Sequence, residues 1–399
     1  MLDLNMVRCT ICLLPSTHET IRFNSDGVCS VCLNIDQKKA IDWDQKKIDL
    51  IGIFNPIRGK FDYDCIIPFS GGKDSTFTLL YAVNDLKLKP LVVSFDHGFY
   101  RPKLIENRNK TLKKLGVDFI SFTPNWKLVQ QLMLRTFLDK GDFCWHCHTG
   151  IFSYPIWIAV EKNVPIVLWG EPSSEYTSYY DYSQVENVDE ARFNRIINLG
   201  ITAEDMEARL DFVFEKRDFK PFTFPDAHIL AKMNLLSIPL GSFIPWDVRS
   251  QVERIKSELD WMGDEVEGVP PEYDFEKIEC YMQGVRDYIK YLKRGYARTT
   301  HLTSIDIRNG KKTREESLKL VGEFEGKKPE SLKLFLEYIG LEESEFMEVV
   351  KHHKISDDLN KVAVKIGPKP KDYDGWVTHP RIDRKISSKI FQDWKQKNF

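Results

Sequence analysis

A short glycine-containing loop is the part of this sequence whose residue types best suit phosphate chemistry. It comprises Ser70, Gly71, Gly72, Lys73, Asp74 and Ser75. Adjacent glycines let a backbone turn sharply and approach a ligand closely. The amides that follow would lie at a helix N-terminus, where an anion is stabilised. The hydroxyls and the Lys73 ammonium add donors for phosphate oxygens, and the Asp74 carboxylate suits Mg²⁺. We therefore expect a nucleotide-phosphate site with Lys73 and Asp74 as catalytic residues.

The alternative for this loop is a glycine turn that ends a strand, with a serine capping the next helix. The loop does not follow the GxxxxGKS pattern of kinases and GTPases. It resembles the SGGxDS loop of the PP-loop ATP pyrophosphatases. This resemblance implies that ATP is cleaved between its α- and β-phosphates and that AMP is left on the substrate.

Two further segments follow apolar runs that are typical of strands. Asp96 and His97 follow one run, and Gly170, Glu171 and Glu175 follow another. Open α/β sheets bind ligands at the carboxyl ends of their strands. We expect Asp96 and His97 to flank adenosine and Gly170 to admit the nucleotide, while Glu171 or Glu175 holds Mg²⁺ or positions the substrate. Glu175 is the third catalytic candidate. The alternatives are a hydrogen-bonded loop histidine and a solvated acidic loop.

Four of the eight cysteines have the spacing of a zinc ribbon. They are Cys9, Cys12, Cys29 and Cys32. Two C-x2-C pairs at this separation fill a tetrahedral Zn²⁺ shell, so the site would be closed and structural. A segment of this size also has too little apolar core to fold without such a staple. The alternative is four unrelated buried thiols.

A second cysteine pair, Cys144 and Cys147, allows several readings. The pair could hold a second metal or an iron–sulfur cluster, or act as a redox couple. Further ligands would have to come from His146, His148 or the distant Cys280. The alternative is a pair of thiols packed beside the active site, and the spacing alone does not decide.

These segments need a scaffold, and the hydrophobic pattern predicts one. Apolar runs indicate strands over residues 63–69, 90–95, 117–123 and 165–170, and helical patterns lie between them at 103–115 and 126–139. Such alternation is typical of a parallel sheet covered on both faces. The predicted fold class is therefore α/β: a PP-loop parallel sheet with an N-terminal zinc ribbon and a mainly helical C-terminal region. The expected domains are residues 1–45, 46–245 and 246–399.

The C-terminal region carries helix signals of its own. Thr313 and Glu316 are spaced as a capping box, which predicts a helix over residues 314–324. Further short helices are expected over 330–338 and 344–352.

Composition limits the possible partners and location. The net charge is −2, and 42% of the residues are hydrophobic. No run of eighteen or so apolar residues could span a membrane, and the first residues lack the pattern of a signal peptide. We expect a cytoplasmic protein with no membrane partner. The acidic balance argues against a large nucleic-acid footprint.

Three segments together resemble the N-acetyl sugar amidotransferase family of acetamidino-sugar and pseudaminic-acid pathways. They are CTICLLPSTHETIRFNSDGVCSVC (9–32), FSGGKDS (69–75) and GYARTTHLTSIDIRNGKKTREESLKLV (295–321). The resemblance implies conversion of a sugar acetamido group to an acetamidino group, with ATP, Mg²⁺ and structural Zn²⁺. It also implies that the substrate is a free or nucleotide-linked diacetamido sugar. His301, Asp306 and Arg308 are then candidates for sugar recognition, the alternative being an ion-pair network.

The resemblance also implies the source of nitrogen. A separate glutaminase subunit with a cyclase-like companion would deliver ammonia, since the sequence shows no internal glutaminase. Two rival functions remain: a tRNA thiolase that uses the same adenylation, and a zinc-ribbon scaffold that only senses ATP. A thiolase would place sulfur in a base, whereas a sensor would bind ATP without forming AMP.

Overall fold

A five-stranded parallel sheet forms the centre of the protein. The computed structural model describes residues 6–172, 186–187, 189–210, 214–367 and 386–398. The strands lie in the order β3-β2-β1-β4-β5. Their bounds are β1 Cys65–Pro68, β2 Pro90–Phe95, β3 Asp118–Phe122, β4 Ile166–Trp169 and β5 Leu236–Pro239. The four strands expected from the sequence are confirmed. The strand β5 was not predicted, because a run of four residues that contains serine and proline shows no usable periodicity.

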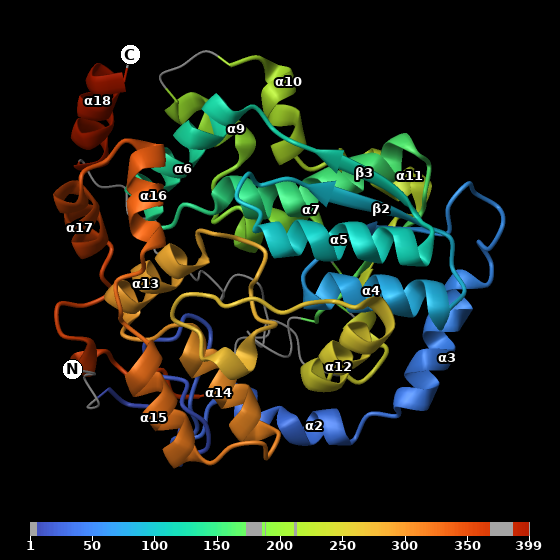
Figure 1. The fold of residues 1–399 in the computed structure, drawn as a ribbon, viewed down its shortest axis with the longest axis horizontal. Helices are drawn as coiled ribbons and strands as arrows, with labels where there is room; N and C mark the ends of the chain where they lie inside the picture. Colours follow the sequence, from blue (N-terminus) through green and yellow to red (C-terminus); the bar gives the residue numbers. More distant parts are fainter. Residues whose placement is uncertain (1–5, 173–185, 188, 211–213, 368–385, 399) are drawn as a thin grey trace.

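Helices cover both faces of this sheet, as Figure 1 shows. The helix α4 packs against β1, β2 and β4 on one face, and α7 packs against the same strands on the other. Every residue of β2 is buried, which explains its continuous apolar run. The helices around the sheet are α3 Trp43–Phe54, α4 Lys73–Asn84, α5 Pro102–Leu115, α6 Trp126–Lys140, α7 Trp145–Glu161, α11 Ala227–Met233 and α12 Val248–Leu259. The expected helices at 103–115 and 126–139 are thus confirmed as α5 and α6.

Local signals set the limits of these helices. The side chain of Asn125 accepts hydrogen bonds from the first amides of α6, and Gly141 ends this helix with a left-handed backbone. Asp247 caps α12 in the same way. Shorter helical segments connect the larger elements. They are α8 Glu190–Arg192, α9 Ala203–Arg209, α10 Lys216–Phe219 and the turns Phe193–Ile197, Lys220–Phe222, Leu240–Ser242, Pro271–Tyr273 and Leu359–Lys361.

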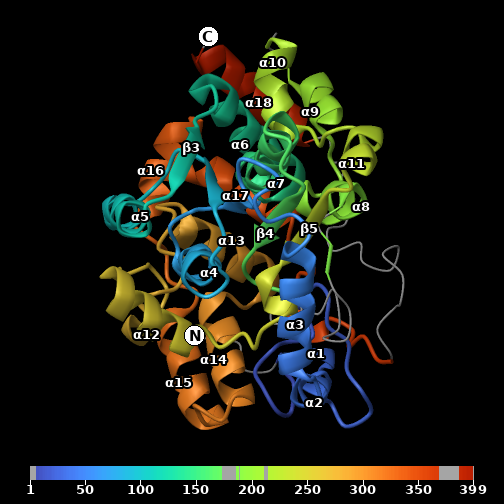
Figure 2. The same cartoon turned by 90° about the vertical axis from the view of Figure 1, so that its right-hand side faces the viewer.

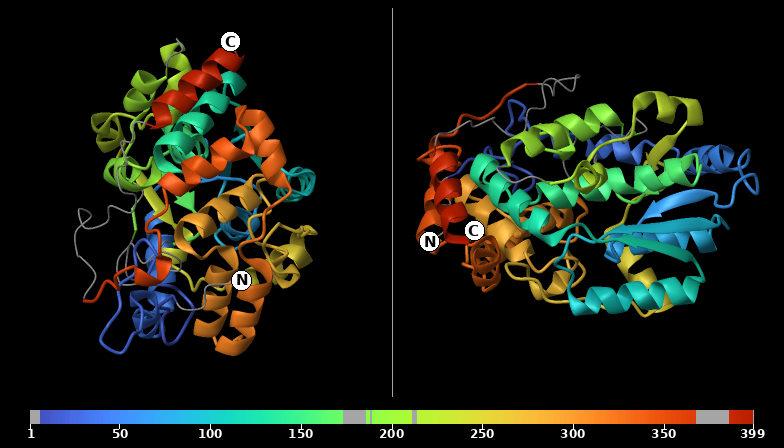
Figure 3. Two further views of the ribbon diagram at one scale, coloured as in Figure 1. Left: turned by 90° about the vertical axis from the view of Figure 1, so that its left-hand side faces the viewer. Right: turned by 90° about the horizontal axis from the view of Figure 1, so that it is seen from above.

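The C-terminal region is helical over most of its described residues. Its helices after α12 are α13 Gln283–Arg294, α14 Arg298–Arg308, α15 Arg314–Phe324, α16 Ser331–Ile339, α17 Glu343–His352 and α18 Ile386–Asn398. The capping box of Thr313 and Glu316 is present at the start of α15. Helix α18 lies along α6, and α13, α16, α17 and α18 share an apolar core with α6 (Figure 3). Among the described residues, no helix combines the length and apolarity needed to cross a bilayer.

The cysteine-bearing N-terminal segment packs against α14 and α15. It includes the short helices α1 Ser30–Leu33 and α2 Ile35–Lys39, which Figure 2 shows beside α14 and α15. The Leu13 amide donates to the Ser304 hydroxyl at 3.1 Å. The Arg314 guanidinium donates to the carbonyls of Cys9, at 2.6 Å, and of Cys12. The segment is therefore held by the C-terminal region as well as by its own cysteines. The three domain boundaries expected from the sequence stay a prediction.

Candidate functional site

The loop of residues 70–75, called the phosphate loop after the ligand expected for it, connects β1 to α4 at the carboxyl edge of the sheet. Gly71 has φ +91°, which only glycine adopts without strain. The amides of Ser70 and Gly71 donate to Ser75 Oγ at 3.3 and 3.2 Å, and Trp261 Nε1 donates to the Gly71 carbonyl at 3.0 Å. Gly72 caps α4 without any side-chain hydrogen bond. The first amides of α4 therefore have no capping side chain, and they form the helix N-terminus that an anion prefers.

Lys73 is buried beside two carboxylates. Its Nζ lies 2.7 Å from Asp74 Oδ2 and 3.0 Å from Glu276 Oε2, and the Lys73 side chain is 4% exposed. Burial acts to raise the pKa of Glu276, but Lys73, Lys277 and Arg298 outweigh it and bring that pKa to about 2. Glu276 thus remains charged and fixes the Lys73 ammonium at the loop.

A cavity of about 240 Å³ opens in front of the loop. The strand order reverses at β1, whose neighbours are β2 and β4, and the cavity is lined by residues from these three strands, at the usual ligand crevice of an open α/β sheet. Of the residues expected in the nucleotide site, Ser70, Asp74, Ser75, Gly170 and Glu171 line it. Apolar lining comes from Phe69, Val93, Phe95, Tyr100, Ile151, Phe152 and Trp169. Such a polar edge with apolar walls suits a nucleotide.

Asp74 and Glu171 form an acidic pair at the cavity. Asp74 Oδ1 is buried without a hydrogen-bond partner among the described residues. Burial and the neighbouring Asp74 charge raise the pKa of Glu171 to about 8, although Lys73 opposes them. Two close carboxylate groups with an unfilled oxygen fit a divalent cation. Glu175, the other acidic candidate, lies outside the described residues.

The residues expected to flank adenosine, Asp96 and His97, lie in the loop that follows β2. His97 is buried, its Nδ1 accepts from the Phe99 amide at 3.3 Å, and burial lowers its pKa to about 4. Asp96 accepts from the Gly98 amide at 2.9 Å. Neither residue is part of the described lining of the cavity. These contacts match the alternative of a hydrogen-bonded loop for this segment.

Gly170 permits a close approach, but its nearest neighbour is protein. A Cβ atom at Gly170 would lie 2.7 Å from Thr78 Oγ1 and 3.2 Å from the Asp74 carbonyl. The glycine therefore lets β4 pack tightly on the first turns of α4 while its backbone faces the cavity.

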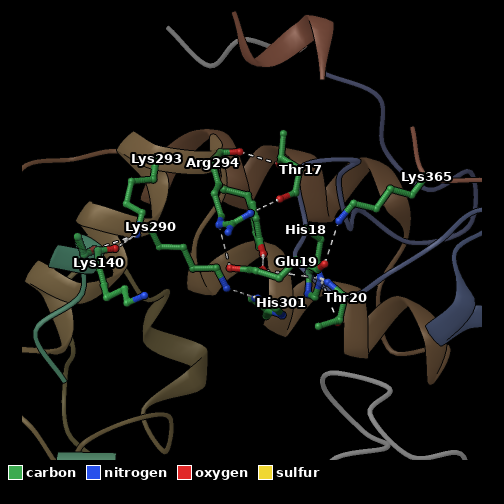
Figure 4. Close-up of polar contacts among 12 residues, drawn as sticks. Thr17, His18, Glu19, Thr20, Lys140, Lys290, Lys293, Arg294, His301 and Lys365 are labelled. Carbon is green, nitrogen blue, oxygen red and sulfur yellow. Dashed lines mark hydrogen bonds and ion pairs between the residues drawn. The ribbon is translucent and has the colours of Figure 1, made fainter. Parts of the chain in front are cut away.

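The three sugar-recognition candidates lie on α14 but have separate neighbours. His301 Nε2 lies 2.9 Å from Lys290 Nζ, next to the N-terminal segment (Figure 4). Asp306 forms an ion pair with Arg249 at 2.6 Å and accepts from the Tyr273 hydroxyl at 2.7 Å. Arg308 lies close enough to Cys12 for its charge to act on that thiol. The structure does not gather the three into one site, and Asp306 has the contacts of a structural ion pair.

Three residues near the loop were not predicted from the sequence: Glu276, Lys277 and Glu279. Lys277 and Glu279 line the cavity, and Lys277 has φ +53°, an uncommon backbone for lysine. A Cβ atom at Gly72 would lie 1.9 Å from Glu279 Oε1, so Glu279 packs directly on the loop. No local motif marks these residues, because they reach the loop from a distant part of the chain.

The four N-terminal cysteines form a compact cluster. All four are buried, and their sulfur atoms lie within 4.8 Å of one another. The Sγ atoms of Cys9 and Cys32 are 3.8 Å apart, and those of Cys12 and Cys29 are 3.7 Å apart. Tetrahedral Zn²⁺, with Zn–S near 2.3 Å, separates its sulfur ligands by roughly 3.8 Å. The arrangement fits the structural zinc expected from the spacing.

Cys280 lies near the second cysteine pair, Cys144 and Cys147, in the structure. Cys144 and Cys147 lie one turn apart at the start of α7, and Cys280 belongs to the segment that bridges Tyr100. Burial raises the pKa of Cys147, and the neighbouring Cys280 raises it further. The three thiols are close enough to act on one another's pKa, but among the described residues only the four N-terminal cysteines have the separations of a metal site.

Comparison with known proteins adds information on the C-terminal region. Residues 272–394 match the family model of the C-terminal domain of WbpG-like LPS biosynthesis proteins. This segment contains Glu276, Lys277, Glu279 and the helices α13 to α17. The match supports an enzymatic role in polysaccharide biosynthesis.

One curated relative matches a shorter part of the chain. It is the uncharacterized protein MJ1599 of Methanocaldococcus jannaschii, which is 30% identical over 116 residues. The match covers 29% of this chain and 42% of that protein, so the chain spans less than half of the relative's length.

Proposed function

We propose that this protein is an ATP-dependent, AMP-forming amidotransferase that converts a sugar acetamido group to an acetamidino group. The observation that carries the proposal is the contact between the phosphate-loop residue Lys73 and Glu276, at 3.0 Å. Glu276 belongs to the segment matched to LPS biosynthesis proteins. This contact joins a phosphate-binding loop to a region with a role in polysaccharide assembly.

The proposed reaction has two steps. The acetamido oxygen attacks the α-phosphate of ATP, so an O–P bond forms and the bond to pyrophosphate breaks. Loss of the amide N–H proton gives an adenylylated imidate. Ammonia then adds to its carbon, and AMP leaves with the former amide oxygen, which gives the protonated, cationic amidine. An amide carbonyl is a poor electrophile, and adenylylation converts its oxygen into a good leaving group.

The loop residues would act on the leaving pyrophosphate. Lys73 and the first amides of α4 supply positive charge where negative charge develops, which is electrostatic catalysis. The Ser70 and Ser75 hydroxyls, 3.2 Å apart, orient the loop. Asp74 and Glu171 would hold Mg²⁺, which neutralises phosphate charge when it is bound. A separate glutaminase with a cyclase-like companion would supply the ammonia.

The test is product analysis with purified protein, ATP, Mg²⁺, ammonium and a panel of diacetamido sugars. Mass spectrometry should show that one oxygen of the sugar is replaced by NH while AMP and pyrophosphate accumulate in equal amounts. Formation of ADP, or of AMP without a modified sugar, would contradict the proposal.

A second candidate is the tRNA thiolase reaction, which the grouping of Cys280 with Cys144 and Cys147 favours. Thiols at these positions could accept and carry sulfur for such a reaction. The same assay with tRNA and a sulfur donor separates the two candidates, because a sulfur-bearing base would identify the thiolase.

A further inference from the structure

We propose that a cationic cluster between α13 and α14 binds an oxyanion group, phosphate or carboxylate, of the sugar substrate. The cluster consists of Arg286, Lys290, Arg294, Arg298 and His301. The proposal rests on the amidotransferase function and specifies its substrate as an anionic sugar.

The fold brings the cluster to one place. Arg286, Lys290 and Arg294 recur every four residues along α13, so they share one face of that helix. Gly295, with φ +74°, turns the chain, and α14 begins at Arg298. Lys290 Nζ then lies 2.9 Å from His301 Nε2 and 4.5 Å from the centre of the Tyr296 ring (Figure 4).

The carboxylates near the cluster are already engaged. Arg294 Nε pairs with Glu19 Oε1 at 3.0 Å, and the Tyr296 hydroxyl donates to the other oxygen of Glu19 at 2.5 Å. Asp287 accepts from Gln283 at 2.8 Å and lies 3.6 Å from Arg298. Glu276, 3.4 Å from Arg298, and Asp142, whose charge acts on Arg286, are two further acids near the cluster, so four carboxylates face its four cationic side chains.

Arg286 and Lys290 are the two cationic members that an anionic ligand would contact. Within the described part of the chain, neither forms an ion pair with a carboxylate. Both side chains are partly exposed to solvent, so a ligand can reach them. Burial lowers the pKa of Lys290, and the charges of Glu19 and Asp287 oppose this shift without cancelling it.

Two buried nitrogen atoms without a hydrogen-bond partner among the described residues lie in the same cluster region. His18 is 3% exposed, and its Nε2 has no partner among the described residues. Its ring lies 5.4 Å from the His301 ring and 5.6 Å from the Tyr296 ring. Arg298 Nε is also buried without a hydrogen bond. Buried polar atoms are rarely left unpaired, and N–H donors in a cationic cluster suit an oxyanion.

The position of the cluster suits a substrate that spans two sites. Arg298 lies 3.4 Å from Glu276 Oε1, and Glu276 Oε2 lies 3.0 Å from Lys73 Nζ. Glu276 therefore contacts both the cluster and the phosphate loop. A sugar held by its anionic group at the cluster would present an acetamido group toward the α-phosphate of ATP.

Some members of the cluster also have structural contacts. Arg294 donates to the Thr17 carbonyl at 2.9 Å and accepts the Thr17 hydroxyl at its own carbonyl. A change at Arg294 would therefore loosen the N-terminal segment as well. Lys290 has no such backbone contact and is the better position for a test.

The experiment is calorimetric titration of the full chain with the phosphate loop filled by α,β-methylene-ATP and Mg²⁺. The probes are uridine diphosphate, glucuronate and neutral N-acetylglucosamine. The variants are Lys290→Glu, the nearly isosteric Lys290→Met, and Lys333→Gln as a control, since Lys333 is 85% exposed on α16. Circular dichroism checks that each variant is folded.

We expect one of the two anionic probes, uridine diphosphate or glucuronate, to bind the wild type and the Lys333→Gln control with equal affinity. Loss of one charge-assisted hydrogen bond should weaken that anion about 10-fold or more in both Lys290 variants. Binding of N-acetylglucosamine should not change. Preference for uridine diphosphate identifies a nucleotide handle, and preference for glucuronate identifies a carboxylate handle.

The proposal is overturned if neither anion binds, or if both Lys290 variants bind the anion as the wild type does. The measurement needs no turnover. An absent AMP-forming reaction would thus reject the proposed function, whereas absent anion binding would reject the subsite alone.

Discussion

Lys73 Nζ lies 3.0 Å from Glu276 Oε2, and both side chains are almost completely buried. Lys73 belongs to the phosphate loop, whereas Glu276 belongs to the segment matched to LPS biosynthesis proteins. A buried lysine keeps its charge only with a close anionic partner. The C-terminal region therefore helps to fix the loop that we propose to bind phosphate.

The first prediction concerns this ion pair. Glu276→Ala should lower the free energy of unfolding by about 1.5–3 kcal/mol, because Lys73 keeps Asp74 and Arg298 keeps Asp287 but both lose their shared carboxylate. Glu276→Gln keeps the shape of the side chain and should lower the free energy of unfolding by less. Urea unfolding measures both, with Glu323→Gln on the exposed side of α15 as the control. An alanine variant as stable as the control would show that the pair is not formed in solution.

The second prediction concerns the loop itself. Lys73→Ala and Asp74→Asn should each abolish pyrophosphate release and leave the fold intact, since they remove charge at the reacting phosphates. A pyrophosphate assay and circular dichroism measure the two effects, and Lys333→Gln serves as the control. Normal turnover in either variant would contradict the assignment of the loop.

The parts of this fold that could be predicted are those with local signals. The strand β2 is an unbroken apolar run, the phosphate loop has its glycines in sequence, and α15 carries its capping box between Thr313 and Glu316. The two C-x2-C pairs likewise gave the cysteine cluster by spacing alone.

The remaining features depend on contacts between distant segments. Glu276 and Cys280 have no motif around them, and only tertiary packing brings them to Lys73 and to the Cys144 pair. His301, Asp306 and Arg308 follow one another closely in sequence but have different neighbours. On α14, Asp306 lies on another side of the helix, and His301 and Arg308 share a side but are about 10 Å apart along the axis. The three residues were expected in one sugar site because they are close in sequence, but in the structure each has different neighbours.

The third prediction concerns the dependence of stability on pH. Glu171 has a pKa of about 8 in the folded protein and an ordinary value of 4.5. Folding therefore takes up a proton between these values, and Glu171 contributes stability that is lost as the pH rises toward 8. Relative to Glu171→Gln, the wild type should lose up to about 1.4 kcal/mol of unfolding free energy per pH unit in this window.

Thermal and urea unfolding between about pH 5 and pH 9, without Mg²⁺, measure this difference. Added Mg²⁺ should stabilise the wild type at high pH more than the glutamine variant, because it compensates the charge of the acidic pair. A difference that does not change with pH would show that Glu171 titrates normally.

The fourth prediction concerns zinc. Removal of zinc by chelation, or the change Cys12→Ser, should loosen the first 45 residues, since zinc binding supplies much of the folding free energy of such ribbons. Hydrogen exchange read by mass spectrometry should show faster exchange around Cys9 to Cys32, with Thr10→Ser, an exposed position in the same turn, as the control.

Binding of ATP should persist, because Trp261 and Glu276 hold the phosphate loop without the ribbon. Binding of an anion at Lys290 should weaken, since His18 and Glu19 belong to the loosened segment. Complete loss of ATP binding on chelation would show instead that the ribbon is needed to build the nucleotide site.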